Sequence, residues 1–270
     1  MSSSGSSTSS GASTSPTSHA PGTSAASVTS TAPSAPSEQS APRRQFAGPD
    51  SGSGSGRRVS LPAALVAVVT VALVVSGIAP YDRATWLMET FWVVISVPVA
   101  VVVWRRFPLT RLLCVLLALH ALILIFGGHY TYARVPLGDW IQDGLGLARN
   151  PYDRIGHFTQ GFVPAVLLRE VLVRRSPLAG SRWLAPLTVC GCLAFSAFFE
   201  MIEWWAALIG GEGADDFLAT QGDVWDTQWD MFLALVGATS ALLLLSRVHD
   251  RLLAGFPRPA PDGAADPPRS

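Results

Sequence analysis

The sequence has 270 residues, and its composition excludes an ordinary soluble domain. Hydrophobic residues make up 49% of it and charged residues 14%, whereas roughly 25% of the residues in a soluble domain are charged. The formal net charge is zero, so the basic excess typical of a nucleic-acid-binding protein is missing and we expect no nucleic-acid partner. The three cysteines, Cys114, Cys190 and Cys192, lie in hydrophobic segments and indicate small core or lipid-facing side chains rather than a disulfide or a metal pair.

Residues 1–58 consist almost entirely of Ser, Thr, Ala, Gly and Pro. Such a segment buries too little apolar surface to offset the entropy of ordering it, so it is predicted to be a disordered tail. It has no charged start followed directly by an apolar run, and therefore it does not resemble a signal peptide. Residues 251–270 are predicted to form a second disordered tail.

The region between the tails, residues 59–250, is predicted to be a transmembrane domain. A helix needs about 20 apolar residues to cross about 30 Å of hydrocarbon, and six segments meet or approach that length. These predicted spans are 61–79, 86–104, 109–126, 150–173, 184–209 and 228–246. The expected fold class is therefore all-α: a polytopic membrane protein whose partner is the lipid bilayer, built as a bundle of about six transmembrane helices.

The arginines predict how this bundle is oriented. They gather before the first span, between the second and third, between the fourth and fifth, and after the sixth, whereas the loop between the fifth and sixth spans has none. By the positive-inside rule, both termini are predicted to be cytoplasmic in a multi-pass protein of the plasma membrane. The start of the fourth span, the end of the fifth and the start of the sixth then face outward.

The third span and the loop after it contain polar and aromatic residues with two interpretations. His120 lies near the middle of the span, where an ionisable side chain is costly. It is predicted to hydrogen-bond a neighbouring helix, with a proton relay as the alternative. His129, Tyr130 and Tyr132 are candidates for a lid or rim, although aromatic residues are also common at membrane interfaces.

The fourth span opens with NPYDRIGHFTQG. Asn150 is predicted to be the N-cap, with Pro151 at the first helical position. Asp153 is interpreted as an acid that offsets the helix dipole. His157 lies one turn further in; a lone histidine there is more often a hydrogen-bonded core residue than a ligand, so its neighbours decide between these interpretations.

Acidic residues cluster at the outward ends of the last two spans. Glu200 and Glu203 are three residues apart in SAFFEMIEWW, and both cannot ionise in a low dielectric without a counter-ion or a shared proton. The sixth span begins with GDVWDTQWDM, where Asp223, Asp226 and Asp230 are predicted to share one helical face. An arginine from the outer loops is a possible partner for the glutamates.

These residues are predicted to converge in one outward-facing site. The candidate metal ligands are His157, Glu200, Glu203, Asp223, Asp226 and Asp230. A histidine with several carboxylates suits a divalent metal ion and equally suits a proton or cation relay. In the enzymatic interpretation, Glu203 and His157 are the candidate catalytic residues, and the metal activates water against a small-molecule or lipid-linked envelope substrate. The alternatives are a proton- or cation-coupled transporter, or a structural cluster that only pins helices together.

Three motifs, NPYDRIGHFTQGFVPA, FSAFFEMIEWW and ATQGDVWDTQWDMFLALVGA, resemble the YjdF-type family of uncharacterised bacterial inner-membrane proteins over about residues 60–250. The resemblance implies a multi-pass plasma-membrane protein and no established activity. A looser likeness is to the VanZ-like membrane family, which is linked to glycopeptide-antibiotic resistance and implies an envelope-related role. Members of that family have an acidic residue before a His-Phe pair, which would correspond here to Asp153 and His157-Phe158. They also have a later acidic residue in a helix, corresponding to Glu200 or Glu203, and an aspartate in the last motif, corresponding to Asp226 or Asp230.

Overall fold

The computed structural model describes residues 60–210 and 220–256. Its helices, in chain order, are α1 (Leu61–Ser76), α2 (Arg83–Val103), α3 (Arg111–Tyr130), the 3₁₀ helix η1 (Tyr132–Arg134), α4 (Pro136–Leu145), α5 (Tyr152–Arg175), α6 (Leu184–Gly210) and α8 (Asp226–Leu253). No strand occurs in these two ranges, which confirms the all-α fold class. The predicted tail of residues 1–58 lies outside the described residues, and α8 continues past residue 251, where the C-terminal tail was predicted to begin.

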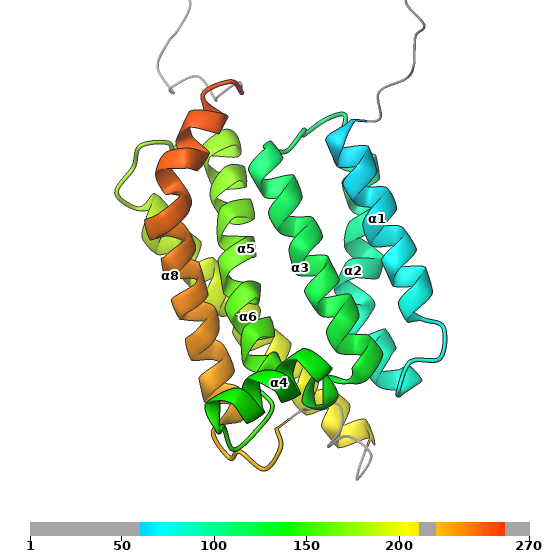
Figure 1. The fold of residues 1–270 in the computed structure, drawn as a ribbon. Helices are drawn as coiled ribbons and strands as arrows, with labels where there is room; N and C mark the ends of the chain where they lie inside the picture. Colours follow the sequence, from blue (N-terminus) through cyan, green and yellow to red (C-terminus); the bar gives the residue numbers. More distant parts are fainter. Residues whose placement is uncertain (1–59, 211–219, 257–270) are drawn as a thin grey trace, which may run out of the picture. The chain divides into compact units, whose positions relative to one another are not determined.

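The six long helices run side by side in two groups of three (Figure 1). In the first group α1 and α2 pack on α3, and in the second α6 and α8 pack on α5. Contacts between α3 and α5 join the two groups. The first residues of α1 and the last residues of α8 lie at the same end of the bundle, and α4 lies at the other (Figure 1). We call that second end the α4 end.

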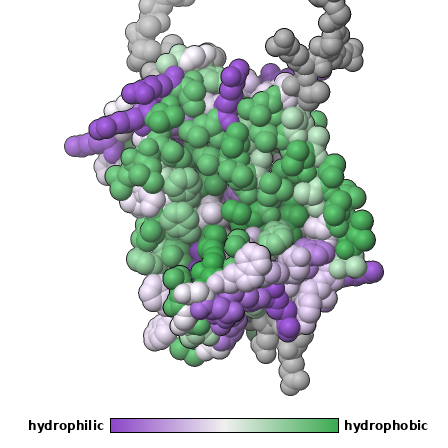
Figure 2. Space-filling model, in the orientation of Figure 1, coloured by the Kyte–Doolittle hydropathy of each residue, from purple (hydrophilic) through white to green (hydrophobic). Residues whose placement is uncertain are grey.

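The surface of the bundle has the polarity of a membrane protein. Figure 2 shows a broad apolar band across the middle of the visible face, with polar side chains gathered toward its two ends. Four helices, α2, α3, α6 and α8, are long and apolar enough to cross a membrane. Of the other two long helices, α1 is apolar but has 16 residues, and α5 buries charged residues that include Asp153, Arg169 and Glu170.

The starts of α2 and α3 follow ordinary capping chemistry. The Asp82 carboxylate accepts a hydrogen bond of 2.7 Å from the Thr85 backbone N–H at the start of α2. This bond lowers the pKa of Asp82 below its usual value, because it favours the ionised form. Thr110 caps α3 in the same way, accepting from the Leu113 N–H. Both α2 and α3 therefore begin where a short polar side chain satisfies a free backbone donor.

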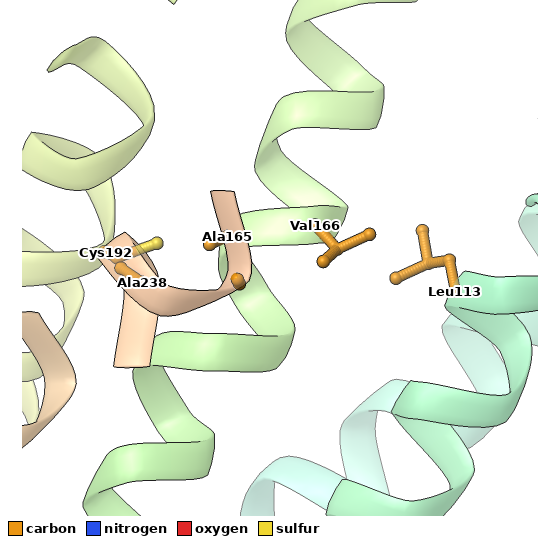
Figure 3. Close-up of a cluster of buried hydrophobic side chains, with 6 residues drawn as sticks. Leu113, Ala165, Val166, Cys192 and Ala238 are labelled. Carbon is orange, nitrogen blue, oxygen red and sulfur yellow. The ribbon is translucent and has the colours of Figure 1, made fainter. Parts of the chain in front are cut away.

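The core is built from small residues where α5 meets α8. One buried cluster consists of Leu113, Ala165, Val166, Cys192, Ala238 and Ala241 (Figure 3). A Cβ atom on Gly161 of α5 would overlap the Ala234 carbonyl of α8, and one on Gly237 would overlap the Phe158 carbonyl. The two backbones therefore touch, as small residues allow in membrane helices. This close contact also brings the polar residues of α5 and α8 together.

The segment expected to be a loop between the third and fourth spans contains η1 and α4, and Asn150 joins it to the bundle. The Asn150 side chain donates to Asp139 of α4 (2.8 Å) and accepts from the Tyr152 N–H (3.0 Å). Its backbone N–H donates to the Gln221 side chain (2.9 Å). The predicted start of the fourth helix is one residue early, since the helix begins at Tyr152 and Pro151 holds the capping position.

Candidate metal centre

Three polar residues follow one face of α5 near the α4 end. Asp153, His157 and Gln160 are separated by four and three residues, so they project from the same side of the helix. All three are buried, with at most 8% of their surface exposed. Asp153 lies in the first turn, as predicted, but it faces this buried cluster and does more than offset the helix dipole.

Helix α8 contributes two buried acids to the same region. Asp226 is its first residue and Asp230 lies one turn further in. Asp223 lies in the turn before the helix, where its carboxylate accepts from the Trp225 N–H (3.0 Å). The prediction that three aspartates share one helical face is therefore wrong for Asp223, because the chain turns at Gly222 with a φ of 84°.

Asp153, His157 and Asp230 form a compact group of possible metal ligands. One ligand atom from each lies within 4.8 Å of the others, and this is the one such group among the residues that the structure describes. His157 Nε2 is 3.5 Å from Asp153 Oδ1 and 3.8 Å from Asp230 Oδ2. Atoms that bind one metal ion at about 2.1 Å and at right angles lie about 3.0 Å apart. Side-chain movements of less than about 2 Å would therefore bring all three ligand atoms onto one ion.

Several polar atoms around this group lack a hydrogen-bond partner. Within the described part of the chain, they are His157 Nδ1, Gln160 Nε2, Glu200 Oε1 and Asp230 Oδ1. A buried polar atom without a partner costs about 1–3 kcal/mol, so four of them around one group are expensive. A bound cation would directly satisfy the acceptor among them, the Asp230 carboxylate oxygen, and a water bound to the cation could accept from the Gln160 amide.

Glu200 of α6 is placed to orient His157. Its Oε1 lies 3.7 Å from His157 Nδ1, on the side of the ring away from the two aspartates. Metal-binding histidines commonly donate their second ring N–H to a carboxylate, which sets the ring orientation and raises its basicity. The predicted ligand Glu200 thus lies behind the histidine rather than beside the aspartates.

The predicted ligands Asp223 and Asp226 face arginines instead. Arg149 forms an ion pair with Asp226 and lies 3.6 Å from Asp223 and 3.5 Å from Asp153. Arg154 donates to Asp223 at 2.8 Å rather than serving the two glutamates of α6. These pairs offset part of the negative charge at the α4 end, and they leave Asp223 and Asp226 outside the three-residue group.

Two glutamates lie at the edge of the cluster and line a cavity with Asp153 and His157. Glu203, a predicted ligand and catalytic residue, is half-buried and lies outside the three-residue group. Glu89 of α2 is 6% exposed and was missed by the sequence analysis. Its signal was available: it is the one acidic residue within the apolar helix α2.

Two further predicted residues line this cavity. His120 Nε2 is buried with no hydrogen-bond partner in the described structure, so the expected bond to a neighbouring helix is absent at that atom. Tyr132, a candidate lid residue, is 5% exposed and its ring packs against Gly127 and Gly156. It anchors η1 between α3 and α5, and it also lines the cavity beside the polar cluster, as a rim residue would.

Comparison with known proteins places the chain in a family. The family model described as "Predicted membrane protein (DUF2238)" matches residues 61–251. The chain belongs to this family. The inner membrane protein YjdF of Escherichia coli (strain K12) is 54% identical to it over 188 residues, which cover 70% of this chain and 90% of that protein. No solved structure matches.

Membership in the DUF2238 family confirms the resemblance to YjdF-type proteins and the multi-pass plasma-membrane location. The looser likeness to VanZ-like proteins is not supported by these comparisons. All six predicted ligands, together with Asp153 and Glu89, fall within the matched residues.

The region shared with the DUF2238 family also contains a polar network at the opposite end of α5. The Glu170 carboxylate, fully buried, accepts from Thr110 N and Oγ1 (3.1 and 2.8 Å), Arg174 (2.8 Å) and His249 Nε2 (3.0 Å). Arg169 donates to His249 Nδ1 at 3.2 Å. These bonds join α3, α5 and α8. Because the Glu170 oxygens are satisfied, the network has the character of a structural joint.

Proposed function

We propose that this membrane protein binds one divalent cation between α5 and α8, with Asp153, His157 and Asp230 as ligands. The observation that carries the proposal is the convergence of these three ligand atoms within 4.8 Å in a buried site. The unsatisfied atoms around them supply independent support. A doubly charged ion would also offset the negative charge of the two ligand carboxylates, Asp153 and Asp230.

The ligand set and its surroundings favour particular chemistry. One imidazole with two carboxylates suits Mn²⁺ or Zn²⁺ better than a soft metal, which prefers sulfur. A bound ion would supply positive charge that polarises a phosphoryl or carbonyl oxygen. Glu203 lines the cavity beside His157, and we propose it as the general base of an envelope or lipid-linked substrate reaction.

We also propose that the α4 end faces outward and that all six long helices cross the membrane. The arginine distribution supports this orientation, as does the position of the α1 start and the α8 end on one side of the bundle (Figure 1). A green fluorescent protein fused after Ser270 should fluoresce and alkaline phosphatase fused there should be inactive. The reverse pattern would contradict the orientation.

The cation site is tested by metal content. After purification in detergent and dialysis against Mn²⁺ or Zn²⁺, the wild-type protein should contain about one ion per chain. His157→Ala and Asp230→Asn should each lower the affinity for the ion by at least about tenfold, because each removes a ligand. His120→Ala is the matched control, since it removes a half-buried histidine that lies outside the ligand group.

The result separates the cation site from its structural alternative. Wild-type protein without metal after dialysis would refute the cation site. If His157→Ala then also lowered the melting temperature, the cluster would serve to hold α5, α6 and α8 together through buried polar contacts.

Glu200→Gln tests the positioning role of Glu200. An amide accepts the histidine N–H less strongly than a carboxylate, so the affinity for the ion should fall by about 10–100-fold while one ion still binds at saturation. Isothermal titration calorimetry with Mn²⁺ measures both quantities. A complete loss of binding sites would instead make Glu200 a direct ligand.

A further inference from the structure

A long cavity of about 860 Å³ extends from the metal centre between the two helix groups. Residues of α1, α2 and α3 line one side, and residues of α5 and α6 line the other. Most of its polar lining lies at one end, where Glu89, Asp153, His157, Gln160 and Glu203 meet, while His120 lies near the middle of α3. Most of the remaining lining is aliphatic or aromatic.

The cavity runs along the helices over a length close to the full thickness of the hydrocarbon core of a bilayer. Its lining on α5 runs from Asp153 to Val171, a distance of roughly 27 Å at 1.5 Å per residue. The hydrocarbon core of a bilayer is about 30 Å thick. The cavity therefore runs along the helices from the polar centre toward Trp104 and Phe107 at the opposite end.

The cavity also opens sideways toward lipid. Several apolar residues that line it are at the same time exposed on the bundle surface, among them Val99 (52%), Val101 (58%) and Val171 (36%). Trp92 of α2 and Phe195 of α6 bridge the two helix groups, with ring centroids 5.1 Å apart. A chain can thus reach the cavity from the bilayer past these exposed apolar lining residues, without crossing water.

We propose that the cavity holds a hydrocarbon chain of a membrane lipid whose phosphate head group lies at the cation. The inference rests on the proposed cation site and names the substrate class for it. An apolar cavity open to the bilayer is filled by lipid chains at no cost in apolar exposure. Phosphate oxygens are hard ligands that suit Mn²⁺, whereas Glu89 and Glu203 would repel a phosphate if no cation were present.

Native mass spectrometry of the detergent-purified protein tests whether the cavity binds a lipid through its phosphate head group. The probes are dioleoyl phosphatidic acid and dioleoylglycerol, which share the same chains and differ in the phosphate. We expect the Mn²⁺-loaded wild type to retain one phosphatidic acid and to bind dioleoylglycerol about tenfold more weakly. His157→Ala should lose this preference for the phosphate.

Variants that fill the cavity test the chain. Ala121→Phe and Ala100→Phe add a ring to two separate points of its lining, and each should lower the retained phosphatidic acid by about tenfold. Val102→Trp is the matched control, because Val102 of α2 is 74% exposed and does not line the cavity. Melting temperatures identify any variant that fails to fold.

The outcomes distinguish this inference from the cation site. If both cavity variants fold and retain as much phosphatidic acid as the wild type, the inference is overturned. Equal binding of phosphatidic acid and dioleoylglycerol by the wild type would also overturn it. If the protein binds the metal ion but the cavity variants do not reduce lipid retention, the lipid inference is overturned and the cation site still stands. Cavity-dependent lipid in a protein that binds no metal refutes the head-group assignment and the cation site together, and leaves only the chain in the cavity.

Discussion

Glu170→Ala should lower the free energy of unfolding by about 3–5 kcal/mol, because it leaves buried partners without their acceptor. The substitution removes the carboxylate to which Arg174, His249 and Thr110 donate. The Arg174 guanidinium is buried and loses its ion pair. We therefore expect a much lower melting temperature in detergent and a large fall in the yield of folded protein.

Asp250→Ala is the matched control for the Glu170 substitution. Asp250 pairs with Arg169 at 2.7 Å at the same end of the bundle, but its side chain is 55% exposed. Solvent screens such a pair, so its loss should cost about 1 kcal/mol or less. Equal stability losses in the two variants would contradict the assignment of Glu170 as the centre of a buried joint.

Gly161→Leu should prevent the normal packing of α5 against α8. Even a Cβ atom at Gly161 would overlap the Ala234 backbone, which cannot move aside as a flexible side chain does. Overpacking a core typically costs about 1–3 kcal/mol, and a backbone clash with a large side chain should exceed that range. We expect little folded protein by size-exclusion chromatography.

The smaller change Gly161→Ala keeps this test informative if the leucine variant does not fold. It should separate α5 from α8, and so move His157 away from Asp230 and weaken cation binding as well as stability. Gly144→Ala in α4 is the control, because a Cβ there meets nothing within 4 Å. Unchanged melting and metal affinity in Gly161→Ala would show that the two helices are not in backbone contact.

The helical framework and four of its apolar helices could be predicted because their determinants are local. Runs of about 20 apolar residues and arginine-rich links are visible along the chain without knowledge of any contact. The ends of helices were less accurate, as at α8, which runs on to Leu253. Near the end of that helix His249 contacts the buried Glu170 carboxylate, a contact that no local sequence pattern indicates.

The position of the site could be predicted from the sequence, but the role of each residue in it could not. His157 and Asp230 stood out because polar residues within apolar segments are costly. Asp153 had a sufficient local explanation as a helix-capping charge, which concealed its place beside His157. The pairing of Asp226 with Arg149 joins residues 77 positions apart, and no local spacing indicates which distant arginine an acid will face.

The second network shows the same limit. Arg169, Glu170 and Arg174 lie at the end of the fourth span, where charged side chains are ordinarily expected to reach the membrane surface. Their burial depends on α3 and α8 closing over them. That closure is a property of the packed bundle and has no signature in the spacing of these residues.

Pulsed electron paramagnetic resonance of the Mn²⁺-loaded protein is the most direct test of the cation site. The proposed ligand set contains one imidazole nitrogen and two carboxylates. We predict one bound Mn²⁺ per chain with a single strongly coupled ¹⁴N nucleus, and we predict that His157→Ala abolishes this coupling while His120→Ala retains it. Bound Mn²⁺ that shows no nitrogen coupling, or the same coupling in His157→Ala, would contradict a metal centre between α5 and α8.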